Sequence, residues 1–240
     1  MPFDIAENIA NVRERIRQAC LRSKRAESSV TLLAVSKAQS TAAIRLAARQ
    51  GIGVIGENYL QEAQEKIAAL KGEPLAWHFI GPLQSNKTAT VAECFAWVQS
   101  VDRLKIAQRL SAQRPAHLPP LNICVQVNID DEGTKSGVAP HELSALLDSI
   151  AALPNLALRG LMAIPLADAE PEQRRASFAH MRELFETHRS RSLQFDTLSM
   201  GMSDDFEIAI EEGATLVRVG SAIFGARPAK NFTSNIQAND

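Results

Sequence analysis

The sequence lacks the features that mark several large classes of protein. No apolar stretch reaches the length of a membrane span and no basic start precedes an apolar segment, so we expect no membrane partner and no secretory leader. The formal charge of −1 argues against a nucleic-acid partner, because such a protein needs a basic surface. The 3 cysteines have no C-x-x-C spacing, and Cys20 and Cys124 fall within apolar segments, as is typical of buried thiols in a reducing compartment. We therefore expect a cytoplasmic protein.

Metal-binding patterns are also missing. His117, His141, His180 and His188 have no ligand spacing, so we expect no metal site. His78 lies within an apolar run, where a hydrogen-bonded core histidine is the favoured interpretation.

The first 25 residues have the spacing of an amphipathic helix. Apolar residues recur every three or four positions at Ile5, Ile9, Val12, Ile16 and Cys20, and arginines and glutamates occupy the opposite face. This pattern predicts a helix over residues 4–25.

Short apolar runs then alternate with helical segments. The runs cover residues 30–36, 52–56, 77–81, 95–101, 121–129, 157–164, 195–200 and 215–220. Helical periodicity covers residues 41–50, 60–70, 103–113, 141–153, 172–188 and 203–212. Nearly continuous apolar strands that alternate with helices indicate a parallel sheet covered on both faces.

Eight such units in 240 residues fit a closed barrel better than an open sheet. We predict the fold class α/β, with a single (β/α)8 TIM barrel and an additional N-terminal helix. Residues 1–227 are expected to form one barrel domain, followed by a polar, flexible tail at 228–240. The alternative is a doubly wound sheet, but no G-x-G-x-x-G follows an early strand.

Two helix starts carry capping residues. Ser40 or Thr41 is placed to cap the helix at 41–50. Ser203 is placed to cap the helix that Gly213 ends.

In a barrel of this kind, chemistry takes place where strands end and helices begin. Lys37 directly follows an apolar run, which puts its amine at the mouth of the barrel. One interpretation is a lysine that reaches water along its aliphatic stem. The other is a neutral amine, favoured by apolar surroundings, which condenses with an aldehyde. Polar groups and glycines recur at the other strand ends, which favours a shared site and the second interpretation.

The last two units contain turns suited to an anion. Residues 199–203 form a glycine-containing turn before a helix, and Gly220-Ser221 forms another. Free backbone amides and serine hydroxyls bind a phosphate without any lysine or arginine. Barrel phosphate sites are often built from the loops after strands 7 and 8. Two ordinary capped turns are the alternative.

Arg218 alternates with two valines, so its side chain is expected to point into the barrel. A buried guanidinium needs a partner. A pyridine nitrogen is one such partner, since arginine only donates hydrogen bonds and keeps that nitrogen unprotonated. An ion pair with Glu57 or Asp102 is an equally open alternative. Asn58 could bind a phenolic oxygen, or it could cap the next helix.

Several longer motifs resemble a known family over about residues 6–226. They are Ala34-Val35-Ser36-Lys37, Gly56-Glu57-Asn58-Tyr59-Leu60-Gln61-Glu62, Trp77-His78-Phe79-Ile80-Gly81-Pro82-Leu83-Gln84-Ser85-Asn86-Lys87, Gly160-Leu161-Met162-Ala163-Ile164-Pro165, Leu198-Ser199-Met200-Gly201-Met202-Ser203-Asp204-Asp205-Phe206 and Val217-Arg218-Val219-Gly220-Ser221-Ala222-Ile223-Phe224-Gly225. The chain resembles the YggS/PROSC-type pyridoxal phosphate homeostasis proteins (the PLPBP family), whose barrel is similar to the N-terminal domain of alanine racemase.

The resemblance implies that pyridoxal 5'-phosphate (PLP) is held as a covalent Schiff base on Lys37. It implies Arg218 as the partner of the ring nitrogen. The other cofactor-binding residues that it implies are Asn58, Met200, Gly201, Ser203, Gly220 and Ser221. Many members carry Thr, another residue and Pro after the lysine, whereas this chain has Ala38-Gln39-Ser40. The resemblance therefore assigns no role to side chains just after Lys37.

Cofactor binding leaves the question of catalysis open. In the alanine racemases that the family resembles, a second acid/base group is a tyrosine from an added domain. This sequence has 1 tyrosine, Tyr59, and few residues after Gly225. An arginine at the ring nitrogen also makes the ring a weak electron sink. We therefore expect a non-catalytic, monomeric protein of vitamin B6 homeostasis that buffers PLP or delivers it to acceptor enzymes. The alternatives are a PLP-dependent amino-acid racemase or lyase and, less favoured, a Schiff-base aldolase without cofactor.

Overall fold

The computed structural model describes residues 4–130, 136–166, 169–191 and 194–225. The expected tail at 228–240 lies outside the described residues, as does the end of the expected barrel domain.

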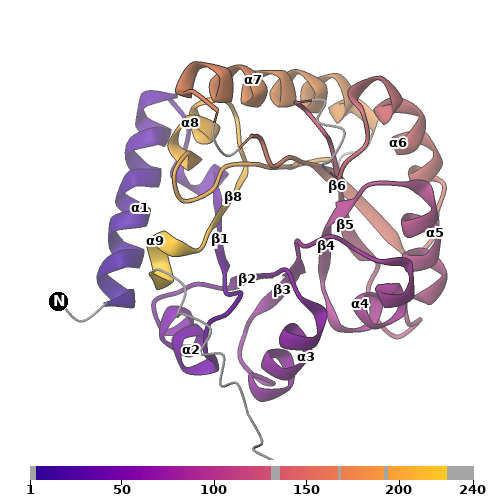
Figure 1. Ribbon diagram of the computed structural model, residues 1–240, viewed down its shortest axis with the longest axis horizontal. Coiled ribbons are helices and arrows are strands. Elements are labelled where there is room, and N and C mark those ends of the chain that lie inside the picture. Colours follow the sequence, from indigo (N-terminus) through magenta and orange to yellow (C-terminus); the bar gives the residue numbers. More distant parts are fainter. Residues whose placement is uncertain (1–3, 131–135, 167–168, 192–193, 226–240) are drawn as a thin grey trace, which may run out of the picture.

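Eight parallel strands close into a barrel in the order β1 to β8 (Figure 1). Their bounds are β1 (Thr31–Val35), β2 (Val54–Glu57), β3 (Ala76–Phe79), β4 (Trp97–Val101), β5 (Leu121–Gln126), β6 (Leu156–Met162), β7 (Thr197–Ser199) and β8 (Leu216–Val219). Strand β8 pairs with β1 from Thr31↔Leu216 to Ala34↔Val219, which closes the ring. The predicted (β/α)8 barrel is confirmed, and each predicted apolar run contains or overlaps one strand.

The helices surround the barrel (Figure 1). Their bounds are α1 (Ile5–Arg22), α2 (Thr41–Arg49), α3 (Leu60–Ala69), α4 (Thr88–Cys94), α5 (Leu104–Gln113), α6 (Leu143–Ala151), α7 (Pro171–His188), α8 (Phe206–Glu211) and α9 (Ser221–Phe224). The predicted N-terminal helix is confirmed as α1, which packs along α8 and α9. Ser40 caps α2 as predicted, because its Oγ accepts a hydrogen bond from the Ala43 amide at 3.2 Å.

Helix α4 was not predicted. Its 7 residues include Thr88, Thr90 and Val91, which are β-branched and have weak helix propensity. Its buried residues are Thr88, Val91 and Ala92, so packing against the barrel stabilises a segment whose local sequence does not indicate a helix.

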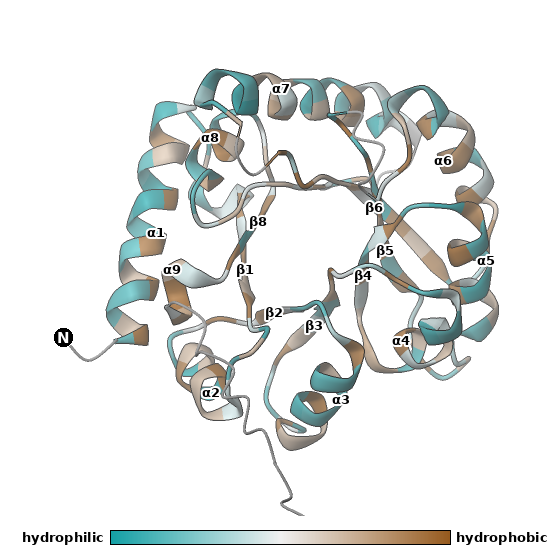
Figure 2. Cartoon of the chain, in the orientation of Figure 1, coloured by the Kyte–Doolittle hydropathy of each residue, from teal (hydrophilic) through white to brown (hydrophobic). Residues whose placement is uncertain are grey.

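Two apolar clusters hold the fold together. The larger lies between the strands and the helices, whose apolar sides face the barrel (Figure 2). The smaller lies on the other face of the strands and consists of Leu33, Val35, Ile80 and Leu216. Burial of the larger cluster supplies most of the apolar surface removed from water, which is the main driving force for folding.

Candidate functional site

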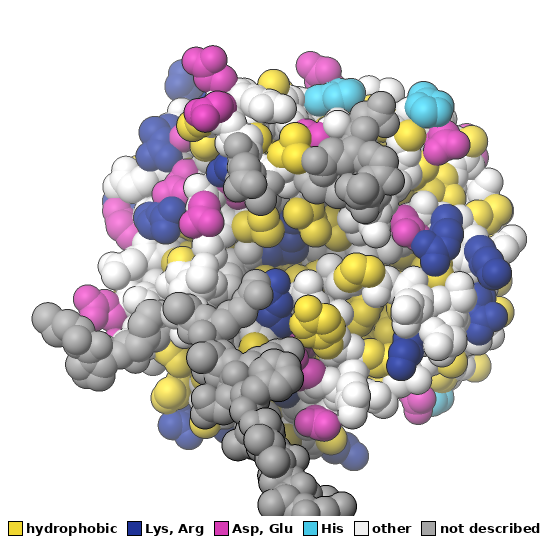
Figure 3. All heavy atoms as spheres, viewed as in Figure 1, with side chains coloured by type: hydrophobic (Ala, Val, Ile, Leu, Met, Phe, Trp, Pro, Cys, Tyr) yellow, Lys and Arg dark blue, Asp and Glu magenta, His cyan; other side chains and the backbone are white. Residues whose placement is uncertain are grey.

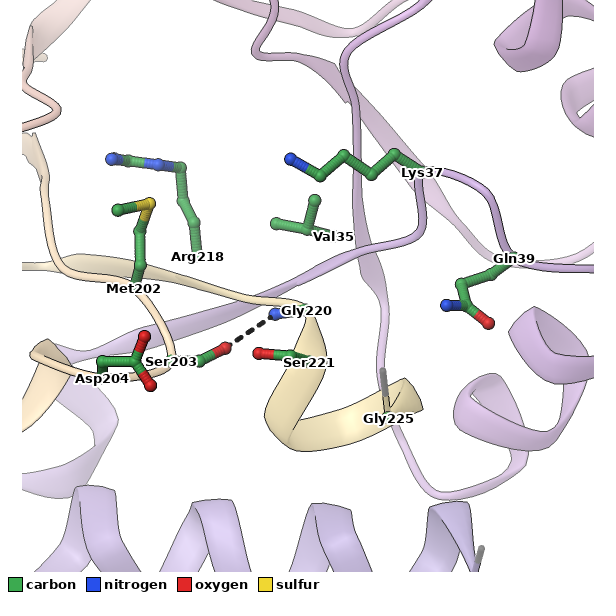
Figure 4. Close-up of a pocket in the computed structure, with 10 residues that line it drawn as sticks. All are labelled: Val35, Lys37, Gln39, Met202, Ser203, Asp204, Arg218, Gly220, Ser221 and Gly225. Carbon is green, nitrogen blue, oxygen red and sulfur yellow. Dashed lines mark hydrogen bonds between the residues drawn. The ribbon is translucent and has the colours of Figure 1, made fainter. Parts of the chain in front are cut away.

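A cavity of about 350 Å³ opens beside the carboxyl ends of β1 and β8 (Figure 4). It brings together five of the residues predicted to bind a cofactor, which are Lys37, Ser203, Arg218, Gly220 and Ser221. The remaining lining residues are Val35, Gln39, Met202, Asp204 and Gly225. Figure 3 shows basic and hydrophobic side chains around a hollow at the centre of this face.

Lys37 follows the last residue of β1 by two positions and is half-buried. Its side chain extends past Val35 toward the part of the cavity that contains Arg218 (Figure 4). The amine therefore faces the cavity interior rather than bulk water.

A buried ionic cluster fixes the backbone on both sides of Lys37. Before the lysine, the Nζ of Lys66 donates to the carbonyl oxygen of Ser36 at 2.6 Å, and the Ser36 hydroxyl donates to Oε1 of Glu57 at 2.5 Å. After the lysine, the amide of Ala38 donates to Oε1 of Glu62 at 2.5 Å. Lys66 joins the two halves, because its Nζ lies 2.7 Å from Glu57 and 2.5 Å from Glu62. We call Ser36, Glu57, Glu62 and Lys66 the Lys37 clamp.

Two of the charges in the clamp are strongly buried, and that of Glu62 is partly exposed. Glu57 is 0% exposed and Lys66 5% exposed. Burial raises the pKa of Glu57, while hydrogen bonds from Lys66 and Ser36 act in the opposite direction. Ala38 has φ +60°, a left-handed conformation that is unfavourable for alanine, and its bond to Glu62 helps to hold it. Ala38, the residue after the lysine, thus takes part in the clamp through its backbone amide.

The sequence prediction did not identify the clamp. One signal was present, because Lys66 lies three residues after Ala63 and one before Ile67, on the face of α3 that packs against the barrel. A lysine on a buried helix face needs an acidic partner.

Ser203 lies in the phosphate-type turn but does not cap α8, and that prediction is wrong. Helix α8 begins at Phe206, after Asp205, whose Oδ1 accepts from the Met202 amide at 2.6 Å. The Ser203 Oγ instead accepts from the amides of Gly220 and Ala222 at 3.3 and 3.4 Å, at the start of α9. Two loops that follow different strands, β7 and β8, therefore meet at one hydroxyl.

Helix α1 braces this turn from outside the barrel. Arg15 forms an ion pair with Glu207 at 2.6 Å, and its NH2 lies 3.4 Å from the carbonyl oxygen of Ser203. Asn8 donates to the carbonyl oxygen of Ile223 in α9 at 3.1 Å. The additional N-terminal helix thus contacts both parts of the turn.

Arg218 points into the barrel as predicted and is 3% exposed. Its NH1 donates to the Ser199 hydroxyl at 2.7 Å, and its NH2 donates to the carbonyl oxygen of Ala163 at 2.8 Å. Burial lowers the pKa of Arg218 to about 10.

The alternative of an ion pair between Arg218 and Glu57 or Asp102 is wrong. Glu57 is bound by Lys66, and Asp102 by Arg103 at 2.7 Å. Arg218 instead donates to the neutral oxygen atoms of Ser199 and Ala163, and Asp205 interacts with its charge at longer range.

Three predicted residues do not line this cavity. Asn58 lines a second cavity of about 290 Å³, and its buried Oδ1 has no hydrogen-bond partner in the part of the chain that the structure describes. The alternative that Asn58 caps α3 is wrong, because Tyr59 occupies that position and no side chain caps the helix. Met200 is fully buried in the larger apolar cluster. Gly201 has φ +91°, and its carbonyl oxygen accepts from the Arg218 amide at 3.0 Å.

The structure also bears on metals and membranes. Within the described ranges, no group of three or more histidine, cysteine or acidic residues is arranged to hold a metal ion. No helix of the described part of the chain is long and apolar enough to cross a membrane.

The barrel, with a lysine after its first strand and an anion-type turn after its last two, defines the class of alanine racemase-like barrels. Residues 5–228 match the family described as "Alanine racemase, N-terminal domain". Within this class, the chain belongs to the YggS/PROSC family of pyridoxal phosphate homeostasis proteins.

The similar proteins cover nearly the full length of the chain. The pyridoxal phosphate homeostasis protein of Pseudomonas aeruginosa is 60% identical over 223 residues, 93% of this chain and 96% of that protein. The protein of the same description from Escherichia coli K12 is 50% identical over 227 residues, 93% of this chain and 97% of that protein. The structure of PipY from Synechococcus elongatus PCC7942 with PLP bound is 37% identical, has a TM-score of 0.79, and covers 92% of this chain and 100% of that one.

Proposed function

We propose that this protein binds PLP in the cavity at the mouth of the barrel, with Lys37 as the covalent anchor, and that it serves vitamin B6 homeostasis without catalytic turnover. The observation that carries the proposal is that Lys37, Arg218 and the turn of Ser203, Gly220 and Ser221 line one cavity of about 350 Å³. The name of the relatives and the bound PLP in PipY support the choice of ligand.

The donor set of the cavity fits the three chemical parts of PLP. When bound, the cofactor supplies an aldehyde carbon that condenses with the Lys37 amine to a Schiff base and releases one water molecule. The clamp keeps the lysine backbone fixed at Ser36 and Ala38, so the amine is presented from a constant position.

The phosphate is assigned to the turn at the start of α9. Backbone amides of Gly220 and Ala222 already converge on the Ser203 hydroxyl, and Ser221 adds a second hydroxyl. Convergent amides at a helix start attract a dianion. Figure 4 places Ser203 and Ser221 on one side of the cavity and the Lys37 amine on the other.

The pyridine nitrogen is assigned to Arg218. An arginine offers only hydrogen-bond donors, so a ring nitrogen beside it accepts and stays unprotonated. An unprotonated ring withdraws electrons weakly, which disfavours carbanion chemistry. Asn58, Met200 and Gly201 remain proposed neighbours of the ring. Within the described residues the buried Oδ1 of Asn58 has no hydrogen-bond partner, so it is able to accept from a protonated phenolic group.

The proposal of a carrier rests on the titratable groups around Lys37. Those that line the cavity with it are Asp204 and Arg218, and Asp204 lies away from the Lys37 amine in Figure 4. Tyr59, the single tyrosine, is 65% exposed. Tyr59 is not among the residues that line this cavity, so the tyrosine that alanine racemases use as a second acid/base group has no counterpart among them.

Loading with PLP tests the anchor. We expect visible absorption in the wild-type protein after incubation with PLP and gel filtration, and its loss in Lys37→Ala. Lys87→Ala is the matched control, since Lys87 is an exposed lysine in the loop after another barrel strand. Equal absorption in wild type and Lys37→Ala would refute the anchor.

Exchange of α-deuterium tests the carrier against the racemase or lyase. We expect no loss of deuterium from a panel of α-deuterated amino acids with the PLP-loaded protein. Loss that depends on Lys37 would identify an enzyme instead. A colourless protein that nevertheless cleaves or joins carbonyl substrates would point to a cofactor-free aldolase.

Delivery and assembly complete the proposal. We propose that PLP passes to PLP-dependent acceptor enzymes and that the carrier is a monomer in the cytoplasm. Mixing the loaded protein with an apo-enzyme should restore that enzyme's activity faster than an equal amount of free PLP in the presence of a PLP-scavenging amine. Light scattering should give the mass of one chain, 26.1 kDa.

A further inference from the structure

Four buried polar side chains form a continuous hydrogen-bonded chain through the barrel. Arg218 NH1 lies 2.7 Å from Ser199 Oγ, Ser199 Oγ lies 2.6 Å from Gln99 Oε1, and Gln99 Nε2 lies 2.8 Å from His78 Nδ1. The exposed fractions of these side chains are 0–3%. The outermost of them, Arg218, lines the proposed PLP cavity.

The chain crosses the barrel rather than following one pair of strands. His78 and Gln99 lie on the adjacent strands β3 and β4, and Ser199 and Arg218 lie on the adjacent strands β7 and β8. The link between Gln99 and Ser199 therefore joins two strands that are not neighbours. Four polar side chains in the barrel interior require full hydrogen bonding, because each unpaired group costs free energy there.

The orientation of the Gln99 amide, with Oε1 toward Ser199 and Nε2 toward His78, fixes the order of donors and acceptors. The guanidinium of Arg218 can only donate, so Ser199 Oγ accepts from it and gives its own proton to Oε1 of Gln99. The amide nitrogen of Gln99 is then the atom that faces His78, and it donates to Nδ1. His78 must therefore be neutral with its proton on Nε2. Burial supports this state, because it lowers the pKa of His78 to about 3.

The far end of the chain is fixed by packing. The ring of His78 stacks on Trp97 with centroids 4.9 Å apart and an interplanar angle of 9°. Arg159 lies 4.8 Å from the centroid of the Trp97 ring and is itself paired with Asp196. The His78 ring, whose Nδ1 is the last acceptor of this hydrogen-bonded chain, is thus held in one orientation.

We propose that His78, Gln99 and Ser199 are positioning residues that act as a one-directional hydrogen-bond relay and present Arg218 as a donor to the pyridine nitrogen of PLP. The inference rests on the proposed function and deepens it. The relay gives Arg218 neutral acceptors on Ser199 and Ala163 in place of a carboxylate. Asp205 acts on the guanidinium through space without a hydrogen bond to it, and the positive charge of Arg218 opposes a proton on the ring nitrogen beside it.

Two replacements of Gln99 separate the relay from simple packing. Gln99→Glu keeps the shape and the acceptor for Ser199, but it puts a negative charge in the barrel and an oxygen opposite His78 Nδ1. The proton of His78 must then move to Nδ1, and the ring nitrogen of PLP becomes easier to protonate. Gln99→Met keeps the length of the side chain and removes both hydrogen bonds, so Ser199 loses its acceptor and Arg218 loses its fixed position.

The first measurement needs no cofactor. Nitrogen-15 NMR of the wild-type apo protein should show His78 with a protonated Nε2 and an unprotonated Nδ1 at neutral pH, with the signal assigned by its absence in His78→Phe. A protonated Nδ1 in the wild type would overturn the relay. This arm is independent of PLP binding.

The second measurement uses PLP labelled with nitrogen-15 in the ring. We expect an unprotonated ring nitrogen in wild type and in the control Gln108→Glu, which adds the same charge on the exposed face of α5. Gln99→Glu should shift the ring signal toward the protonated form. Gln99→Met should bind PLP about threefold to tenfold more weakly, the range expected for the loss of one or two hydrogen bonds.

The outcomes distinguish a failure of the relay from a failure of the proposed PLP binding. Wild-type ring signal and wild-type affinity in both Gln99 variants would overturn the relay while the proposed function stands. Failure of the wild type to bind PLP would overturn the proposed function, and the His78 measurement would still decide whether the relay has the stated order. If the Gln99 variants do not fold, Ser199→Ala removes the hydrogen bonds from Arg218 and to Gln99 with a smaller change in side-chain volume. A wild-type ring signal and PLP affinity in that variant would also overturn the relay.

Discussion

The Nζ atom of Lys66 lies 2.7 Å from Oε1 of Glu57, and this buried pair supports the backbone that carries Lys37. The pair links α3 to the end of β2, and through Ser36 it reaches the end of β1. Glu57 is 0% exposed and Lys66 is 5% exposed, so water solvates neither charge well. Each charge therefore depends on the other for its stabilisation.

Lys66→Met should therefore destabilise the protein by about 3–5 kcal/mol, since it leaves the Glu57 carboxylate buried without its cation. The double variant Lys66→Met with Glu57→Gln should recover part of that loss, because it removes the unpaired charge. Urea unfolding followed by circular dichroism measures both. A double variant no more stable than Lys66→Met would contradict the assigned pairing.

Ser203→Ala should weaken PLP binding about threefold to tenfold, the effect expected for one lost hydrogen bond, with little loss of stability. The reason is that the Ser203 hydroxyl organises the amides of Gly220 and Ala222. Equilibrium dialysis of PLP gives the affinity. Ser149→Ala is the control, because that exposed hydroxyl donates to the carbonyl oxygen of Ala145 within its own helix. An equal effect of the two changes would argue against the phosphate assignment.

Gly201→Ala should destabilise the fold by about 2–5 kcal/mol, the sum of left-handed strain and overpacking. Gly201 has φ +91°, and a Cβ there would lie 2.6 Å from Cβ of Ala209 and 2.9 Å from Cα of Phe206. Thermal unfolding measures the effect. Wild-type stability would mean that the turn before α8 adapts freely, against its close packing in the structure.

Stability should fall in mild acid because of His78. Burial lowers its pKa from 6.5 to about 3, so below pH 6.5 the unfolded chain takes up a proton that the folded protein does not. The contribution of His78 to stability is thus complete above pH 6.5 and is lost as the pH falls toward 3. From these two values, the wild type should lose about 2 kcal/mol relative to His78→Phe between pH 7.5 and pH 5. Parallel pH profiles of the two proteins would contradict the buried, neutral histidine.

The barrel was predictable because parallel strands covered on both faces are read from the sequence as apolar runs. Strand β5, for example, is buried along nearly its whole length. Lys37 and Arg218 were predictable from their places at the end of one strand and on the inward face of another. Helix α4 was not, because its local propensity is weak and tertiary packing stabilises it.

The relay left no signal in the sequence, and the clamp left one, the lysine on the buried face of α3. The contacts that complete them join different strands, as with Ser36 and Glu57, which are 21 residues apart, and Gln99 and Ser199, which are 100 residues apart. Such contacts depend on the closure of the barrel and on side-chain length, and neither leaves a periodic pattern. The misassigned cap at Ser203 has the same origin, since its partners lie 17 and 19 residues away in the next loop.

The central claim is that Lys37 anchors PLP, and chemical trapping tests it most directly. The PLP-loaded protein is reduced with borohydride, digested, and its peptides are mapped by mass spectrometry. We predict the reduced pyridoxyl group on the peptide that contains Lys37, with no stable modification after the same treatment of Lys37→Ala. The group on Lys66, Lys87 or any other lysine, with Lys37 unmodified, would contradict the claim.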